Sequence, residues 1–84
     1  MYYVYMLRLS DDSLYTGYTG DLNRRIKSHK AGRGSKYVKG RLPLKLVYKE
    51  KHESRRKAMQ RENEIKKLSK ERKENLIKKK ESEF

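Results

Sequence analysis

Two glycines and a run of helix-forming residues follow one another in Tyr15-Thr16-Gly17-Tyr18-Thr19-Gly20-Asp21-Leu22-Asn23-Arg24-Arg25-Ile26-Lys27-Ser28-His29. The segment predicts the end of a strand, a tight turn and a helix that runs from about Asp21 to about Ala31. Gly17 and Gly20 permit close backbone approaches that a Cβ atom would block. Asp21 is suited to cap the helix, because its carboxylate can accept from the free N–H groups of the first turn. Spacings of three and four then place four side chains on one helix face, namely Leu22, Arg25, Ile26 and His29.

The residues before this segment predict a β-hairpin. Tyr2 to Leu9 is rich in aromatic and aliphatic residues on both alternating faces, which is typical of a central strand. A turn at residues 10–12 and a second strand from Ser13 to Tyr18 follow. A three-residue loop would place Tyr5 and Tyr15 on the same face of the sheet, whereas a two-residue loop would place them on opposite faces. We predict the three-residue loop, because an aspartate at its last position tolerates the left-handed conformation that such loops use.

A glycine-spaced, basic stretch at residues 32–41 follows the first helix. Its backbone N–H groups and cations could wrap a phosphate backbone, or it could be a solvated connection. A third strand is expected from Leu44 to about Lys51. Leu44, Leu46 and Tyr48 are expected to alternate inward along it.

Two helices are expected in the last third of the chain. The first begins at Glu53 or Ser54 and reaches about Leu68, and Ser69 caps a short final helix that packs through Leu76 and Ile77.

Glu62 falls inside the apolar stripe of the longer helix, four residues after Ala58 and three before Ile65, whereas Glu64 falls on the polar side. A carboxylate directed at a small core needs a partner, because burying an unpaired charge is costly. That partner could be a structural arginine or a metal ion in a cleft.

The composition indicates one small, strongly basic domain. The 84 residues include 24 Lys and Arg against 11 Asp and Glu, and the formal net charge of +13 is spread over both halves of the chain. Such a domain attracts polyanions, of which nucleic acid is the usual one. Cysteine is absent, which excludes a disulfide framework and a thiolate metal site. The longest apolar run, residues 1–7, is far shorter than the ~20 residues of a membrane span, and we expect a soluble, cytoplasmic protein.

Several of these residues together resemble the GIY-YIG nuclease domain, in its small stand-alone form. The resemblance rests on Tyr3-Val4-Tyr5, on Tyr15-Thr16-Gly17 ten residues later, and on Arg25, His29 and Glu62 at family spacing. The family's order of elements is the one expected above. We therefore predict an α+β fold with a three-stranded, mainly antiparallel sheet flanked by helices, in the order β-β-α-β-α-α. The domain would cover residues 1–77, with residues 78–84 as a basic, frayed tail.

The sequence departs from the family pattern at a few positions. Tyr3 and Val4 stand where the family name has Gly and Ile, and Thr16 stands for the middle Ile of the second motif. These positions shape the sheet. Tyr18 occupies a position where some family nucleases carry a lysine beside the scissile phosphate, so one expected cation is missing.

The resemblance implies hydrolysis of phosphodiester bonds, in DNA more than in RNA, with weak sequence specificity and with one Mg²⁺ or Mn²⁺ ion. Glu62 would bind the ion, and Arg25 would neutralise charge on the phosphoryl oxygens. Tyr5 or Tyr15 would orient or deprotonate the attacking water, assisted by His29, and the sequence does not decide between the two tyrosines. A protein partner could supply targeting. The alternative is a non-catalytic nucleic-acid-binding module on the same scaffold. The residues expected to bind nucleic acid are Lys27, Lys30, Arg33, Lys36, Lys39 and Arg41.

Overall fold

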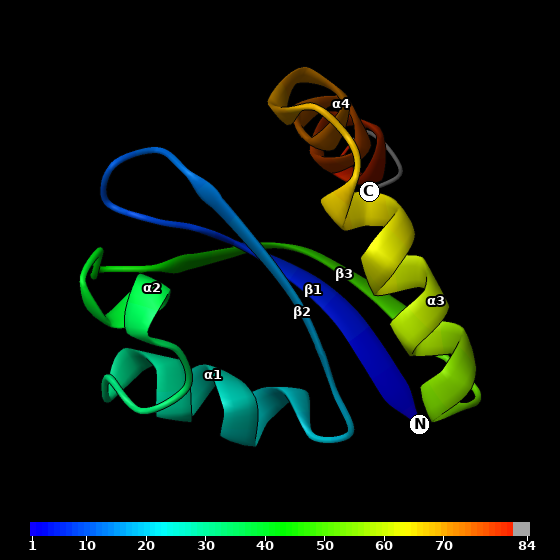
Figure 1. Ribbon diagram of the computed structural model, residues 1–84, viewed down its shortest axis with the longest axis horizontal. Coiled ribbons are helices and arrows are strands. Elements are labelled where there is room, and N and C mark those ends of the chain that lie inside the picture. The colour runs from blue at the N-terminus through cyan, green and yellow to red at the C-terminus, as the bar shows by residue number, and fades with distance from the viewer. Residues whose placement is uncertain (82–84) are drawn as a thin grey trace.

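The computed structural model describes residues 1–81 as a three-stranded sheet with two layers of helices. The elements in chain order are β1 (Tyr2–Arg8), β2 (Leu14–Thr19), α1 (Leu22–Lys30), α2 (Lys36–Lys39), β3 (Lys45–His52), α3 (Arg55–Lys66) and α4 (Lys70–Glu81). Both strand pairs are antiparallel and the strand order is β2-β1-β3. In Figure 1, α1 and α2 lie on one side of the sheet, and α3 and α4 lie on the other. The expected α+β class is confirmed.

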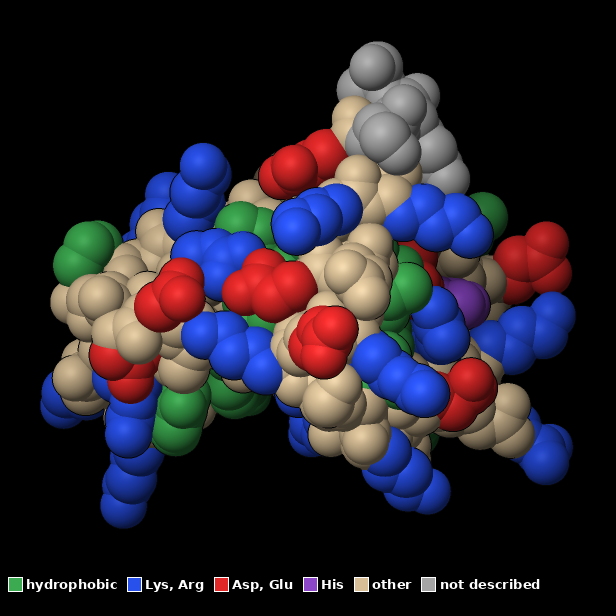
Figure 2. All heavy atoms as spheres, turned by 90° about the horizontal axis from the view of Figure 1, so that it is seen from above, with side chains coloured by type: hydrophobic (Ala, Val, Ile, Leu, Met, Phe, Trp, Pro, Cys, Tyr) green, Lys and Arg blue, Asp and Glu red, His purple; other side chains and the backbone are tan. Residues whose placement is uncertain are grey.

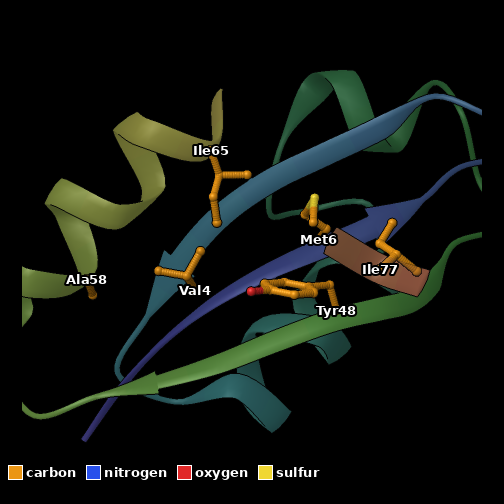
Figure 3. Packing of buried hydrophobic residues seen from close by; sticks show 6 residues of the cluster. All are labelled: Val4, Met6, Tyr48, Ala58, Ile65 and Ile77. Carbon is orange, nitrogen blue, oxygen red and sulfur yellow. The ribbon is translucent and has the colours of Figure 1, made fainter. Parts of the chain in front are cut away.

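β1 is the central strand because both of its faces are apolar. Val4 and Met6 are fully buried in a cluster that also contains Tyr48, Ala58, Ile65 and Ile77, under α3 and α4 (Figure 3). Tyr5, Leu7 and Leu9 point to the opposite face and are buried with Val38 of the α2 turn. Leu22 and Ile26 from α1 pack against this second cluster. A strand with two apolar faces is thus covered on both sides, as predicted.

The hairpin between β1 and β2 has the predicted three-residue loop. Leu7 pairs with Tyr15 and Tyr5 pairs with Gly17, so Tyr5 and Tyr15 share one face. Asp12 at the end of the loop adopts a φ of 67°, the left-handed conformation that was expected there. The register that brings the two tyrosines together therefore follows from the length of this loop.

β3 differs from its prediction in one respect. The register against β1 shifts between Met6, which pairs with Tyr48, and Leu7, which pairs with Leu46. This bulge inserts one residue, so the side chains do not alternate regularly along the strand. Tyr48 joins the core under α3 and α4, Leu44 packs on the opposite face, and Leu46 is 36% exposed. The expectation that all three alternate inward is therefore wrong.

The helices begin where the sequence predicts. Asp21 caps α1, Ser54 caps α3, and Ser69 accepts a hydrogen bond of 3.2 Å from the backbone N–H of Arg72 at the start of α4. α4 continues through Glu81, so residues 78–81 are helical where a frayed tail was expected, and the rest of that tail lies outside the described residues. None of the helices within residues 1–81 is long and apolar enough to span a membrane.

The sequence analysis missed α2. This single turn lies within the stretch that was expected to be a loop, and the Ser35 hydroxyl accepts from the backbone N–H of Val38 at its start. Val38 is fully buried, which fixes the turn against the sheet.

Candidate active site

Three aromatic side chains meet on the face of the sheet that α1 and α2 cover. Tyr5 comes from β1, Tyr15 from β2 and His29 from the last turn of α1. The Tyr5 hydroxyl lies 2.8 Å from Nε2 of His29. The Tyr15 ring centroid lies 6.4 Å from that of Tyr5 and 5.3 Å from that of His29, which it meets edge-on. The predicted site residues Tyr5, Tyr15 and His29 are thus in contact.

Two glycines make room for this cluster. A Cβ atom on Gly17 would lie 2.6 Å from the Tyr5 hydroxyl oxygen, and a Cβ atom on Gly34 would lie 2.4 Å from Nδ1 of His29. Real Cβ atoms do not come this close to other heavy atoms. The backbone therefore forms part of the wall around both polar groups, and any side chain at either position would push one of them aside.

Both polar groups of the Tyr5–His29 pair are held in their neutral forms. Burial, and then the neighbouring phenol of Tyr15, raise the pKa of Tyr5 well above its usual value, although the Arg25 cation acts in the opposite direction. Burial, and then the Arg25 cation, lower the pKa of His29 below its usual value. At neutral pH the pair is therefore a phenol and an uncharged imidazole.

The surroundings of His29 indicate which of its nitrogens carries the proton. Nδ1 is buried and has no hydrogen-bond partner among residues 1–81. A buried N–H without a partner is costlier than an unused lone pair. We therefore assign the proton to Nε2, which donates to the Tyr5 oxygen. The hydrogen of the Tyr5 hydroxyl is then free to be donated elsewhere.

Arg25 stands beside this pair on the exposed flank of α1. It lines a polar cavity of about 350 Å³ between the end of β2, α1 and the loop before α2. Its charge acts on both Tyr5 and His29. The other residues that line the cavity are Thr19, Asp21, Arg24, Ser28, Arg33 and Gly34.

Sequence reasoning did not single out Arg24 or Ser28. Their helical spacing from Asp21, three and seven residues, was the available signal, because it places both near Arg25 on one flank of α1.

Glu62 comes from α3, in the other layer, yet its charge reaches the Tyr5 phenol and raises its pKa. Its carboxylate is 13% exposed, and its ion-pair partner is Nζ of Lys66 at 3.5 Å, one helical turn further on. Among residues 1–81 no arginine forms an ion pair with Glu62, and Arg61, which precedes it in the chain, binds Glu50 at 2.9 Å. Glu64 is 66% exposed, as expected for the polar side of α3.

A metal ion at this site would have few protein ligands. Residues 1–81 contain no group of three or more His, Cys, Asp or Glu side chains that could hold one. A lone carboxylate fits only a hard cation such as Mg²⁺, which keeps several waters and takes phosphate oxygens as further ligands. Glu62 is compatible with such a site and not with a metal held by the protein alone.

The residues expected to bind nucleic acid fall into two groups. Lys27, Lys30, Lys36 and Lys39 are exposed on α1 and α2, and Arg33 lines the cavity next to Arg25. Arg41 is different, because its guanidinium donates to the Asp11 carboxylate at 3.0 Å and to the Tyr37 carbonyl at 3.1 Å. Arg41 thus has its partners inside the protein.

Tyr18, at the position where some family nucleases have a lysine, lies on the opposite face of the sheet and packs against the core under α3. Arg55 at the start of α3 approaches its hydroxyl at 3.4 Å. A cation is therefore present near this position, although it comes from another element.

Comparison with known proteins gives a consistent result. The model of the GIY-YIG catalytic domain matches residues 1–75. A UPF0213 protein of Natronomonas pharaonis is 51% identical over 76 residues, which cover 90% of this chain and 89% of that protein. A UPF0213 protein of Clostridium perfringens is 53% identical over 77 residues, covering 92% and 83% of the two chains.

Two solved structures are also similar. The NMR structure of a UPF0213 protein from Bacillus halodurans has a TM-score of 0.61 and 48% identity, covering 93% of this chain and 84% of the other. The NMR structure of a protein from E. faecalis has a TM-score of 0.67 and 37% identity, covering 99% and 88%.

Proposed function

The chain belongs to the GIY-YIG catalytic domain family, which implies a nuclease-type activity, and from this premise we propose a divalent-metal-dependent endonuclease. Its substrate is nucleic acid, with DNA preferred, and its intrinsic sequence specificity is weak. The observation that carries the proposal is the contact between Tyr5, His29 and Tyr15, with Arg25 and Glu62 both close enough to act on the Tyr5 phenol.

In the proposed reaction a water molecule attacks phosphorus, the bond from phosphorus to the leaving ribose oxygen breaks, and solvent protonates that oxygen. Arg25 neutralises the charge that develops on the non-bridging oxygens. Glu62 would hold the metal ion, which when bound would supply further positive charge at the phosphate.

The two tyrosines have different roles in this proposal. An unperturbed phenol costs roughly 4 kcal/mol to ionise at pH 7, and the raised pKa of Tyr5 increases that cost. Tyr5 therefore stays neutral and donates its hydroxyl hydrogen to the water or to a phosphate oxygen, while His29 fixes its orientation. The Tyr15 hydroxyl makes no hydrogen bond within residues 1–81 and is partly exposed. Tyr15 is thus the tyrosine that contacts the attacking water. As the tyrosinate it takes up the proton of that water and becomes a neutral phenol, and it then returns the proton to solvent.

A cleavage assay tests the proposal. Plasmid, branched and single-stranded DNA and an RNA of matched length are incubated with the wild type and with Tyr15→Phe, in Mg²⁺, in Mn²⁺ and in excess EDTA. We expect cleavage only with a divalent ion, reduced about 100-fold or more in Tyr15→Phe. Cleavage in EDTA would contradict the metal requirement, and full activity in Tyr15→Phe would contradict the role of Tyr15.

A second candidate function is a binding module without catalysis. It is favoured by Tyr18, an aromatic residue at a position where some family nucleases carry a lysine. This candidate predicts no cleavage of these substrates under any metal condition. It also predicts binding to the same DNA, measured by gel shift, that weakens as the salt concentration rises.

A further inference from the structure

The α2 turn touches two of the three rings in the candidate active site. Gly34, just before the turn, lies against the His29 ring, and a Cβ there would be 2.4 Å from Nδ1. Tyr37, within the turn, stacks on Tyr15 with ring centroids 6.5 Å apart and planes 25° from parallel. The next residue, Val38, is buried in the same cluster as Tyr5. A short segment that the sequence presented as a basic loop is therefore packed directly behind the site.

A series of contacts extends from this turn to the tip of the hairpin. The Arg41 guanidinium lies 3.8 Å from the centroid of the Tyr37 ring, an arrangement in which the cation is attracted to the face of the ring. The same guanidinium donates to the Tyr37 carbonyl and to Asp11. Asp11 is itself fixed by Ser13, whose hydroxyl donates to it at 2.5 Å. Both ends of the Tyr37 residue, its backbone and its ring, are thus held by one arginine.

We propose that Tyr37 and Arg41 are positioning residues that hold the Tyr15 ring in place for the reaction. The inference rests on the proposed function. Tyr37 is 42% exposed, so burial alone does not explain its orientation. Within residues 1–81 the Arg41 guanidinium binds the Asp11 carboxylate and the Tyr37 carbonyl. Under this proposal Arg41 acts within the protein, whereas the sequence analysis expected it to bind nucleic acid.

The Tyr15 ring has little other support among the described residues. Tyr15 lies on β2, an edge strand, and only one of the sheet's strands flanks it. Its hydroxyl has no hydrogen bond within residues 1–81 to fix the ring from the far end. The ring contacts with Tyr5, His29 and Tyr37 therefore contribute to its orientation. A displacement of a reacting group by about 1 Å can cost about 100-fold in rate.

The environment of the Tyr15 ring can be measured by ¹⁹F NMR, which does not require the protein to be active. The protein is labelled with 3-fluorotyrosine at its seven tyrosines, and the ¹⁹F resonance of Tyr15 is assigned with Tyr15→Phe. Tyr37→Leu and Arg41→Gln should both shift or broaden the Tyr15 resonance, whereas Tyr37→Phe, which keeps the ring, should leave it nearly unchanged. An unchanged Tyr15 resonance in both Tyr37→Leu and Arg41→Gln would overturn the proposal. Thermal melts followed by circular dichroism verify that each variant is folded.

Kinetics and binding supply the second readout. In cleavage assays, Tyr37→Leu and Arg41→Gln should lower kcat about 10- to 100-fold with KM changed less than about threefold. The matched control is Lys45→Gln, which removes the same charge from an exposed position at the start of β3 and should leave kcat and the salt slope near their wild-type values. If Arg41→Gln lowered the salt slope of DNA binding by about one, as a lost phosphate contact would, the assignment would be wrong. A wild type that cleaves nothing but shows the expected ¹⁹F shifts would refute the proposed function and leave the positioning of Tyr15 intact.

Discussion

Gly34 packs tightly against the imidazole of His29 in the candidate site. It lies over Nδ1 of His29, the buried nitrogen that has no hydrogen-bond partner within residues 1–81. Because the two are this close, the space that a second hydrogen bond would need is taken up by backbone. The single hydrogen bond of the imidazole, to Tyr5, is a consequence of that arrangement.

We therefore expect Gly34→Ala to displace His29 and to destabilise the protein by about 1–3 kcal/mol. Urea denaturation measures the loss. Gly40→Ala is the matched control, because the nearest atom to its added Cβ is 3.7 Å away and its φ is −74°. The control should be neutral or slightly stabilising. Equal stability of the two variants would mean that His29 can move away without cost, so that the tight packing around it has no structural role.

At the scale of elements, the hairpin tip joins the two helical layers. Arg8 binds the Glu74 carboxylate of α4 through two hydrogen bonds, of 2.8 Å and 2.5 Å. Asp12 accepts from Lys70 of α4 at 3.1 Å, while Asp11 accepts from Arg41 beyond α2. The loop that sets the register of the two tyrosines is therefore anchored on both sides of the sheet.

Because of these ion pairs, the free energy of unfolding should depend on pH in the acidic range. The hydrogen bonds from Arg8 lower the pKa of Glu74, and those from Lys70 lower the pKa of Asp12. A carboxylate with a lowered pKa stabilises the fold above its unfolded-state pKa and loses that contribution as the pH falls through its folded-state pKa. Stability should therefore decline as the pH is lowered below about 5.

Glu74→Gln should cost about 1 kcal/mol at pH 7 and should flatten this acid dependence, as measured by urea denaturation between pH 7 and pH 3. Glu71→Gln, at an exposed position in the same helix, should leave the pH dependence as it is. A Glu74→Gln variant with the acid dependence of the wild type would show that the pair with Arg8 does not contribute.

The elements also show what sequence reasoning could reach. β1 was predictable as the central strand because only a position between two other strands, with helices on both sides, buries both of its apolar faces. The length of the hairpin loop then placed Tyr5 and Tyr15 on one face.

The bulge in β3 left no local signal, since Val47 fits either strand face. α2 was missed because a four-residue turn has no periodicity, and its stability comes from the burial of Val38. The pairing of Arg41 with Asp11 joins residues that are distant in sequence, so the arginine resembled any other basic residue of that loop.

For the whole molecule, the excess of positive charge is distributed along the chain. Figure 2 shows Lys and Arg side chains across the face that it presents, with Asp and Glu between them. Net charge of +13 therefore gives attraction to polyanions from many directions. Productive binding requires local contacts, and we propose that those are made by the lysines of α1 and α2 together with Arg33.

A salt titration tests this proposal. The logarithm of the binding constant should fall by ~0.9 for each phosphate that is neutralised on duplex DNA, per unit of log salt concentration. Replacing Lys36 and Lys39 together by Gln should lower this slope by about two, equally on two unrelated duplexes. The control is Arg72→Gln with Lys78→Gln, which removes the same charge from exposed positions on α4, in the other layer. An equal change of slope in both double variants would mean that net charge, and not the α2 surface, governs binding.

The central claim is that Glu62 and the tyrosine–histidine cluster form a metal-dependent nuclease site. The most direct measurement is single-turnover cleavage of labelled DNA in Mg²⁺ or Mn²⁺ by the wild type, Glu62→Gln and Glu64→Gln. Both variants remove one carboxylate from the same helix, but Glu62 is 13% exposed and Glu64 is 66% exposed. We expect Glu62→Gln to lose about 100-fold or more in rate while DNA binding stays equal or becomes tighter, and Glu64→Gln to cleave as the wild type does. Equal cleavage rates for the wild type and Glu62→Gln would contradict the account.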